Sequence, residues 1–221
     1  RRHRRTNLPL WTVWLCFGFV YYGIVLSATR SEVDSTDDFS RLAVCSNFDY
    51  RGLVLGASME YVGLPAAVVA IDYAGRVATQ FVAYAAVAAG AALVACSGRL
   101  ALPSGLALAA GLLARAGAGG AAGATWTHAP ELYPGDEATL IRATGHGVAS
   151  AWARAGAALV SATALGTRAG DGVLPGPALG AVLAAVGVIA ALGAAVLPET
   201  AGGRFESSVE GENNINLDVS L

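Results

Sequence analysis

Six long apolar runs limit what this chain can fold into. They occupy residues 8–29, 53–71, 77–96, 105–124, 143–165 and 178–197. A helix needs about 20 apolar residues to cross a bilayer, and a backbone in lipid must satisfy its own hydrogen bonds. Only 14% of the residues are charged, against about 25% in a typical soluble domain. We therefore expect an all-α integral membrane protein with six transmembrane helices.

The polar segments predict how this bundle is oriented. Residues 1–7 contain four arginines, the only dense basic cluster in the chain. By the positive-inside rule, this basic segment lies in the cytosol. The bundle would then occupy residues 8–198, and six crossings return residues 199–221 to the cytosol. That tail is polar and acidic, a composition typical of disorder. The prediction is a multi-pass membrane protein with both termini cytosolic.

Charged residues gather where the runs end on the predicted cytosolic face. Side chains of opposite sign could hold the helix ends together in one conformation and separate in another. An exposed ion pair contributes only about 0 to 1 kcal/mol, so such a gate needs several pairs. The alternative is that these residues are solvated capping groups. The candidate gating residues are Asp72, Arg76, Glu131, Arg142, Glu199 and Arg204.

Three charged residues and a tryptophan inside the runs are candidates for binding a substrate. Arg154 lies near mid-bilayer, where an arginine costs at least about 2.5 to 3.5 kcal/mol. A bound anion could offset that cost, as could a structural pair with Glu60 or with helix carbonyls. Glu60 is placed either to carry a coupled proton between states or to form a permanent ion pair. Arg115 is expected nearer the outer interface or facing protein, and Trp152 shares the run of Arg154.

Other classes of function find little support in the sequence. The net charge of −2 excludes a globally basic nucleic-acid binder. The chain has no Cys/His metal cluster, P-loop or dinucleotide motif, so we expect no metal and no cofactor. Gly56-Ala57-Ser58 is followed by Met59, so the Gly-x-Ser-Gly nucleophile of an intramembrane serine protease is missing. We therefore do not expect an enzyme.

Three sets of residues resemble motifs of the major facilitator superfamily, and they follow in the same order along the chain. The closest likeness is to the branch of organic cation and anion transporters and synaptic-vesicle-glycoprotein-like transporters. Asp72-x-x-Gly75-Arg76 is similar to the tight loop between helices eight and nine, and Pro198-Glu199-Thr200 to the motif that closes helix twelve. The region of helices ten and eleven is matched by Glu131-Leu132-Tyr133-Pro134, Arg142-Ala143-Thr144-Gly145 and Ala153-Arg154-Ala155-Gly156.

This resemblance implies the C-terminal half of a twelve-helix transporter. Residues 1–7 would end the central loop, and the six helices would form two inverted three-helix repeats that work with a missing N-terminal six-helix half. Gly75 joins the gating residues, and the position of Arg154 is associated in that branch with selectivity for charged substrates. The implied function is secondary active or facilitative transport of a small organic, charged solute across the lipid bilayer by alternating access. A proton is a candidate coupled ion.

Two alternatives stay open. Thr144-Gly145-His146-Gly147 also looks like the matching stretch of proton-phosphate symporters, and sugar porters share the Pro-Glu-Thr ending, so a proton-coupled phosphate or sugar symporter is one alternative. The other is a non-transporting membrane regulator, favoured by departures from the family motifs. Residues 135–138 look like an insertion, which puts a Glu131–Arg142 pair in doubt, and Val77 and Ala201 stand where basic residues are usual.

Overall fold

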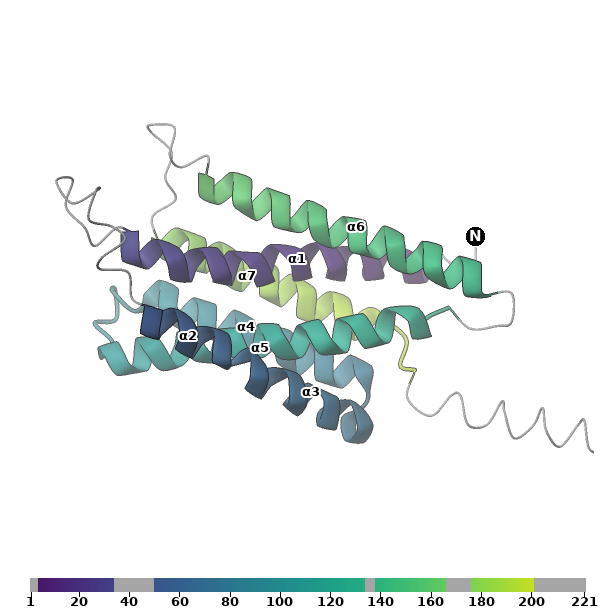
Figure 1. Cartoon of the computed structure of the whole chain (residues 1–221), viewed down its shortest axis with the longest axis horizontal. Coiled ribbons are helices and arrows are strands. Elements are labelled where there is room, and N and C mark those ends of the chain that lie inside the picture. The colour runs from purple at the N-terminus through teal and green to yellow at the C-terminus, as the bar shows by residue number, and fades with distance from the viewer. Residues whose placement is uncertain (1–3, 34–49, 134–137, 166–175, 201–221) are drawn as a thin grey trace, which may run out of the picture.

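The computed structural model describes residues 4–33, 50–133, 138–165 and 176–200, and in these ranges the chain is helical without a strand. The helices run side by side along the length of one bundle (Figure 1). The predicted all-α membrane bundle is therefore confirmed. In chain order the helices are α1 (Arg4–Val33), α2 (Tyr50–Ser58), α3 (Glu60–Ala74), α4 (Arg76–Cys96), α5 (Ser104–Glu131), α6 (Ala138–Leu165) and α7 (Gly176–Val196).

Five stretches of the described residues are long and apolar enough to cross a membrane. They are Thr6–Ser27, Gly52–Ala74, Arg76–Cys96, Ser104–Glu131 and Pro177–Val196. The sixth predicted span corresponds to α6, which has 28 residues but contains Arg142, His146 and Arg154. These polar residues lower its hydropathy. In Figure 1, α6 lies alongside α1, so it takes the sixth place in the bundle.

Two of the predicted helix boundaries were wrong. The run 53–71 is not one helix, because α2 and α3 are separated at Met59, whose N–H bonds to the carbonyl of Gly56 three residues earlier. Pro65 lies in the first two turns of α3 and removes a further backbone bond there. The run 105–124 is too short, because α5 continues to Glu131 through Pro130. Glu131 therefore lies on a helix and not in a connection.

The larger contacts between the helices have the exchange symmetry that two inverted repeats require, whereas the smaller contacts of α3 with α4 and of α5 with α6 have no counterpart of similar size. The first repeat contains α1, the α2–α3 span and α4, and the second contains α5, α6 and α7. Exchanging the repeats replaces α1 by α5, the α2–α3 span by α6, and α4 by α7. The contact of α1 with α6 then matches that of α3 with α5, and the contact of α1 with α7 matches that of α4 with α5. The contacts of α4 with α7 and of α1 with α5 each map onto themselves. This pattern agrees with the predicted arrangement of repeats.

Glycines let the backbones of neighbouring helices touch. A Cβ at Gly18 of α1 would overlap the carbonyl of Ala153 on α6, and a Cβ at Gly63 of α3 would overlap that of Ala116 on α5. In lipid there is no hydrophobic drive between helices, so close packing of this kind holds the bundle together. The Ala- and Gly-rich composition of these helices therefore serves packing.

The outer surface of the bundle is apolar. Tyr61, Val68 and Tyr73 on α3 are more than half exposed, as are Leu192 and Val196 on α7. In water such a surface would promote aggregation. Lipid is the solvent that suits it.

Candidate functional site

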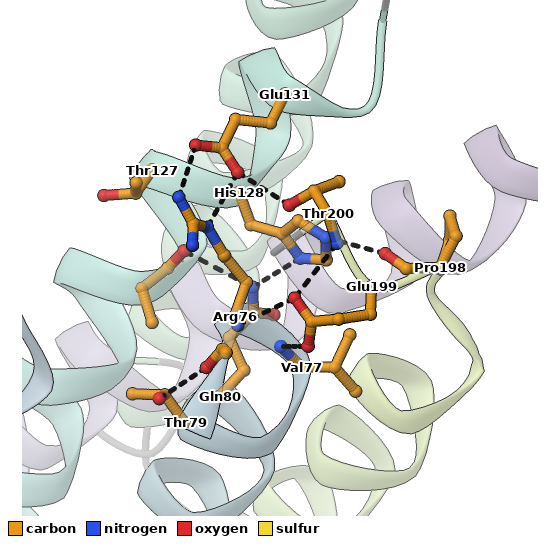
Figure 2. Close-up of polar contacts among 12 residues, drawn as sticks. Arg76, Val77, Thr79, Gln80, Thr127, His128, Glu131, Pro198, Glu199 and Thr200 are labelled. Carbon is orange, nitrogen blue, oxygen red and sulfur yellow. Dashed lines mark hydrogen bonds and ion pairs between the residues drawn. The ribbon is translucent and has the colours of Figure 1, made fainter. Parts of the chain in front are cut away.

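Charged and polar side chains form a cluster at one end of the bundle, where α3, α5 and α7 finish and α4 begins. We call this the charged end. Figure 2 shows that the side chains come from α4, from α5 and from the segment that follows α7. The cluster consists of Arg76, Gln80, His128, Glu131, Glu199 and Thr200, with the carbonyl of Pro198.

A two-pronged ion pair joins α4 to α5. Arg76 Nε lies 2.9 Å from Glu131 Oε2, and Arg76 Nη2 lies 3.1 Å from Glu131 Oε1. Thr200, beyond α7, donates its hydroxyl to Glu131 Oε2 at 2.6 Å. The two charged side chains are only 22% and 14% exposed, and bidentate charge-assisted bonds are stronger than ordinary surface pairs. Three separate segments are thereby tied together by one carboxylate.

Glu199 caps the N-terminus of α4. Its Oε1 accepts the backbone N–H of Arg76 at 3.0 Å, and its Oε2 accepts that of Val77 at 2.9 Å. The first N–H groups of a helix lack partners within the helix, and the positive end of the helix dipole attracts the carboxylate. Only the backbone of Val77 is used here. The lack of a basic side chain at Val77 therefore does not weaken this cap.

Gly75 makes room for the cap. Its φ of 87° lies in the left-handed region, and a Cβ there would come within 2.7 Å of the Glu199 carboxylate. Gly75 was predicted as a gating residue from the motif alone. The structure gives the physical reason for a glycine at this position.

We predict that Gly75→Ala destabilises the folded chain by about 1 to 3 kcal/mol, because alanine is strained at positive φ and displaces Glu199. Thermal unfolding in detergent micelles would show a lower midpoint temperature. Gly147→Ala on α6 is the matched control, since a Cβ there meets nothing within 4 Å. A midpoint unchanged by Gly75→Ala would contradict the role given to the cap.

A buried polar network lies beneath the ion pair. Gln80 Nε2 is 2.8 Å from His128 Nδ1, and His128 Nε2 is 3.0 Å from the carbonyl of Pro198. A carbonyl can only accept and an amide nitrogen can only donate, so the neutral imidazole with its proton on Nε2 fits both partners. This network was not predicted from the sequence. Helical spacing was an available signal, since Gln80 lies one turn after Arg76 and His128 one turn before Glu131.

The remaining predicted gating residues lie apart from the cluster. Asp72 is exposed. Arg142 donates to the carbonyl of Tyr133 at 3.4 Å, whereas Glu131 pairs with Arg76. Tyr133 in turn donates to Asn7 at 3.0 Å, and burial raises the pKa of its hydroxyl, which keeps it a donor. Arg204 and residues 135–137 of the suspected insertion lie outside the described residues.

A second set of polar residues lies inside the membrane span. Arg115 on α5 forms an ion pair with Glu60, the first residue of α3. The Glu60–Arg154 pair considered as a structural alternative is therefore not formed, and Arg154 is exposed on α6. Trp152 stacks on Trp11 of α1, with ring centroids 6.3 Å apart. Of the candidate substrate residues, the structure thus brings together Glu60 and Arg115.

Comparison with known proteins gives one informative similarity. No protein-family model matches the chain. Over 164 residues the chain is 31% identical to the Caenorhabditis elegans protein named "Putative transporter svop-1". The alignment covers 70% of this chain but only 30% of that relative, so the chain spans less than a third of the protein it resembles. This similarity supports a transporter in general, as the helices support a multi-pass membrane protein.

Proposed function

We propose that the chain is the C-terminal six-helix half of a twelve-helix carrier of the major facilitator type, most similar to the synaptic-vesicle-glycoprotein-like branch. It moves a small organic, charged solute by alternating access. The N-terminal half supplies the other wall of the central site, and the two halves rock against each other around it. The charged end faces the cytosol.

The cluster of Arg76, Glu131, Glu199 and Thr200 is the observation that carries this proposal. A static helix end needs only a cap, but this cluster ties the start of α4 to the ends of α5 and α7 through two carboxylates. Such bonds can exist in one conformation and break in another. The similarity to a transporter-named protein gives independent support.

An uptake screen tests the proposal. The complete carrier containing this chain is placed in lipid vesicles and offered organic anions, organic cations, phosphate and sugars, with and without a pH gradient. Saturable uptake of one class above empty vesicles is expected. Proton-driven uptake of phosphate or a sugar alone would favour the symporter alternatives. Uptake that equals empty vesicles for every class would favour a membrane regulator.

A further inference from the structure

We propose that Arg115, Glu60 and Tyr21 form the binding site for a small organic carboxylate, and that Glu60 takes up a proton as the carboxylate binds. The inference rests on the proposed transport function. It names the chemical class of the solute and the coupled ion.

Three helices supply the site. Arg115 Nη2 is paired with Glu60 Oε1, and Tyr21 of α1 donates its hydroxyl to Glu60 Oε2 at 3.2 Å. The Arg115 guanidinium lies 5.5 Å from the centre of the Tyr21 ring, within the range of a cation–π contact. Along their helices, all three residues are about 21 to 24 Å from the charged end, at 1.5 Å per residue. They therefore meet at one depth within the membrane.

Arg115 has an unused donor. Its Nη1 is buried and has no hydrogen-bond partner among the described residues. A buried polar atom without a partner is rare and calls for an explanation. The guanidinium fork fits a carboxylate with two parallel bonds, yet Glu60 occupies only one of its two outer nitrogens. The Arg115 side chain is 15% exposed and that of Glu60 28%, so the surrounding helices do not fully enclose the pair.

Aromatic rings give the site an apolar wall. Tyr21 packs against Phe17 at 5.7 Å and against Tyr22 at 5.5 Å between ring centroids. An aryl or alkyl body would lie well against these rings. Inorganic phosphate has no such body. This wall favours an organic carboxylate over phosphate.

The break between α2 and α3 places Glu60 at a helix start inside the span. Glu60 follows Met59 directly and is the acidic residue of the first turn of α3. Transporters commonly build their sites at such discontinuous helices near the bilayer midplane. On α5, a Cβ at Gly119 would touch the Glu60 backbone at 3.1 Å. The glycine thus lets α5 approach α3 and holds Glu60 close to Arg115.

Charge balance links the carboxylate to a proton. The Glu60–Arg115 pair is neutral, and a carboxylate arriving from water would leave a net negative charge in lipid, which is costly. A proton transferred from water to Glu60 removes that charge and frees Arg115 Nη2, so that neither outer nitrogen is held by Glu60 and both are available to the anion. The titratable groups that contact Glu60 are Tyr21 on α1 and Arg115 on α5, and Tyr22 lies next to Tyr21. None of them is a second carboxylate.

Binding of benzoate to the complete carrier in detergent tests this inference. Calorimetry in two buffers of different ionisation enthalpy counts the protons taken up. About one proton per benzoate is expected, and the affinity should fall as the pH rises. Glu60→Gln should bind benzoate with no proton uptake and no pH dependence.

Variants of the arginines separate the possible sites. Arg115→Gln should lose benzoate binding, but it also leaves Glu60 without its partner. The double variant Glu60→Gln/Arg115→Gln removes both charges. It should also fail to bind benzoate, while size-exclusion chromatography shows that it is folded. Arg99→Gln, at an exposed arginine outside the span, is the control and should bind like wild type. Benzoate binding lost in Arg154→Gln but retained in Arg115→Gln would overturn the assignment, as would binding without a proton in wild type.

A transport measurement keeps this inference distinct from the proposed function. If the carrier transports another solute in vesicles but neither binds benzoate nor takes up a proton with it, the carboxylate site is wrong and the transporter stands. If proton-linked binding is present but no solute of any class enters the vesicles, the site stands and the transport function is wrong.

Discussion

Replacing Gly63 by leucine is expected to reduce the yield of folded protein by about tenfold or more. Gly63 faces the backbone of α5, where even a Cβ would overlap the carbonyl of Ala116. Overpacking a core costs about 1 to 3 kcal/mol when side chains can adjust, and a carbonyl in a helix cannot move aside. α3 packs mainly against α5, so we expect α3 to separate from the bundle. Size-exclusion chromatography in detergent measures the monodisperse fraction.

Gly56→Leu is the matched control for this prediction. Gly56 lies on α2, and a Cβ there meets nothing within 4 Å. Its yield should stay close to that of wild type. Equal losses in the two variants would mean that glycine content, and not the contact of α3 with α5, limits folding.

Arg76→Ala in the complete carrier is expected to lower the rate of solute uptake by about 5- to 150-fold. The substitution removes both prongs of the pair with Glu131 and leaves that carboxylate without its arginine. Loss of one partner of a fully buried pair costs about 3 to 5 kcal/mol. Water reaches both side chains here, so we expect about 1 to 3 kcal/mol, and each 1.4 kcal/mol is a factor of ten in an equilibrium. Initial rates in vesicles measure the effect.

A double-mutant cycle checks that the effect comes from the pair. Arg76→Ala/Glu131→Ala should be no slower than the worse single variant, because contacting residues are not additive. Arg99→Gln controls for the loss of an arginine. If the fold-reduction in uptake rate of the double variant equals the product of the two single reductions, Arg76 and Glu131 act separately.

The sequence predicted the spans because apolar length is a local property. It did not predict where α5 ends, because Thr125, Thr127 and His128 interrupt the apolar pattern and Pro130 signals a stop. Side-chain bonds to Gln80 and Pro198 hold that last turn in the helix. Contacts between helices override the local signal at this end.

The candidate sites were predicted as residue types, but the pairs that form, Arg76 with Glu131 and Arg115 with Glu60, were not among the pairs considered. Arg76, Glu131 and Glu199 were identified because the motif places them at helix ends. The partner of Glu60 was not identified, since nothing in the sequence sets the rotation of α3 against α5. That rotation depends on Gly63 and Gly119, where the backbones come close. Arg154 was favoured by its depth in the membrane, but depth does not specify the face of a helix.

The central claim is that the charged cluster forms and breaks as the carrier changes state. A single cysteine at Val77, which is partly buried in the first turn of α4, can report on it in a carrier whose native cysteines are replaced by alanine. The rate at which an impermeant thiol reagent labels this cysteine from the side of the charged end is the measurement we would make. If the cluster forms and breaks, labelling is slow in wild type and faster in Arg76→Ala, and the wild-type rate changes when transported solute is added. One labelling rate in all three conditions would show that the cluster is a static cap and would contradict the account.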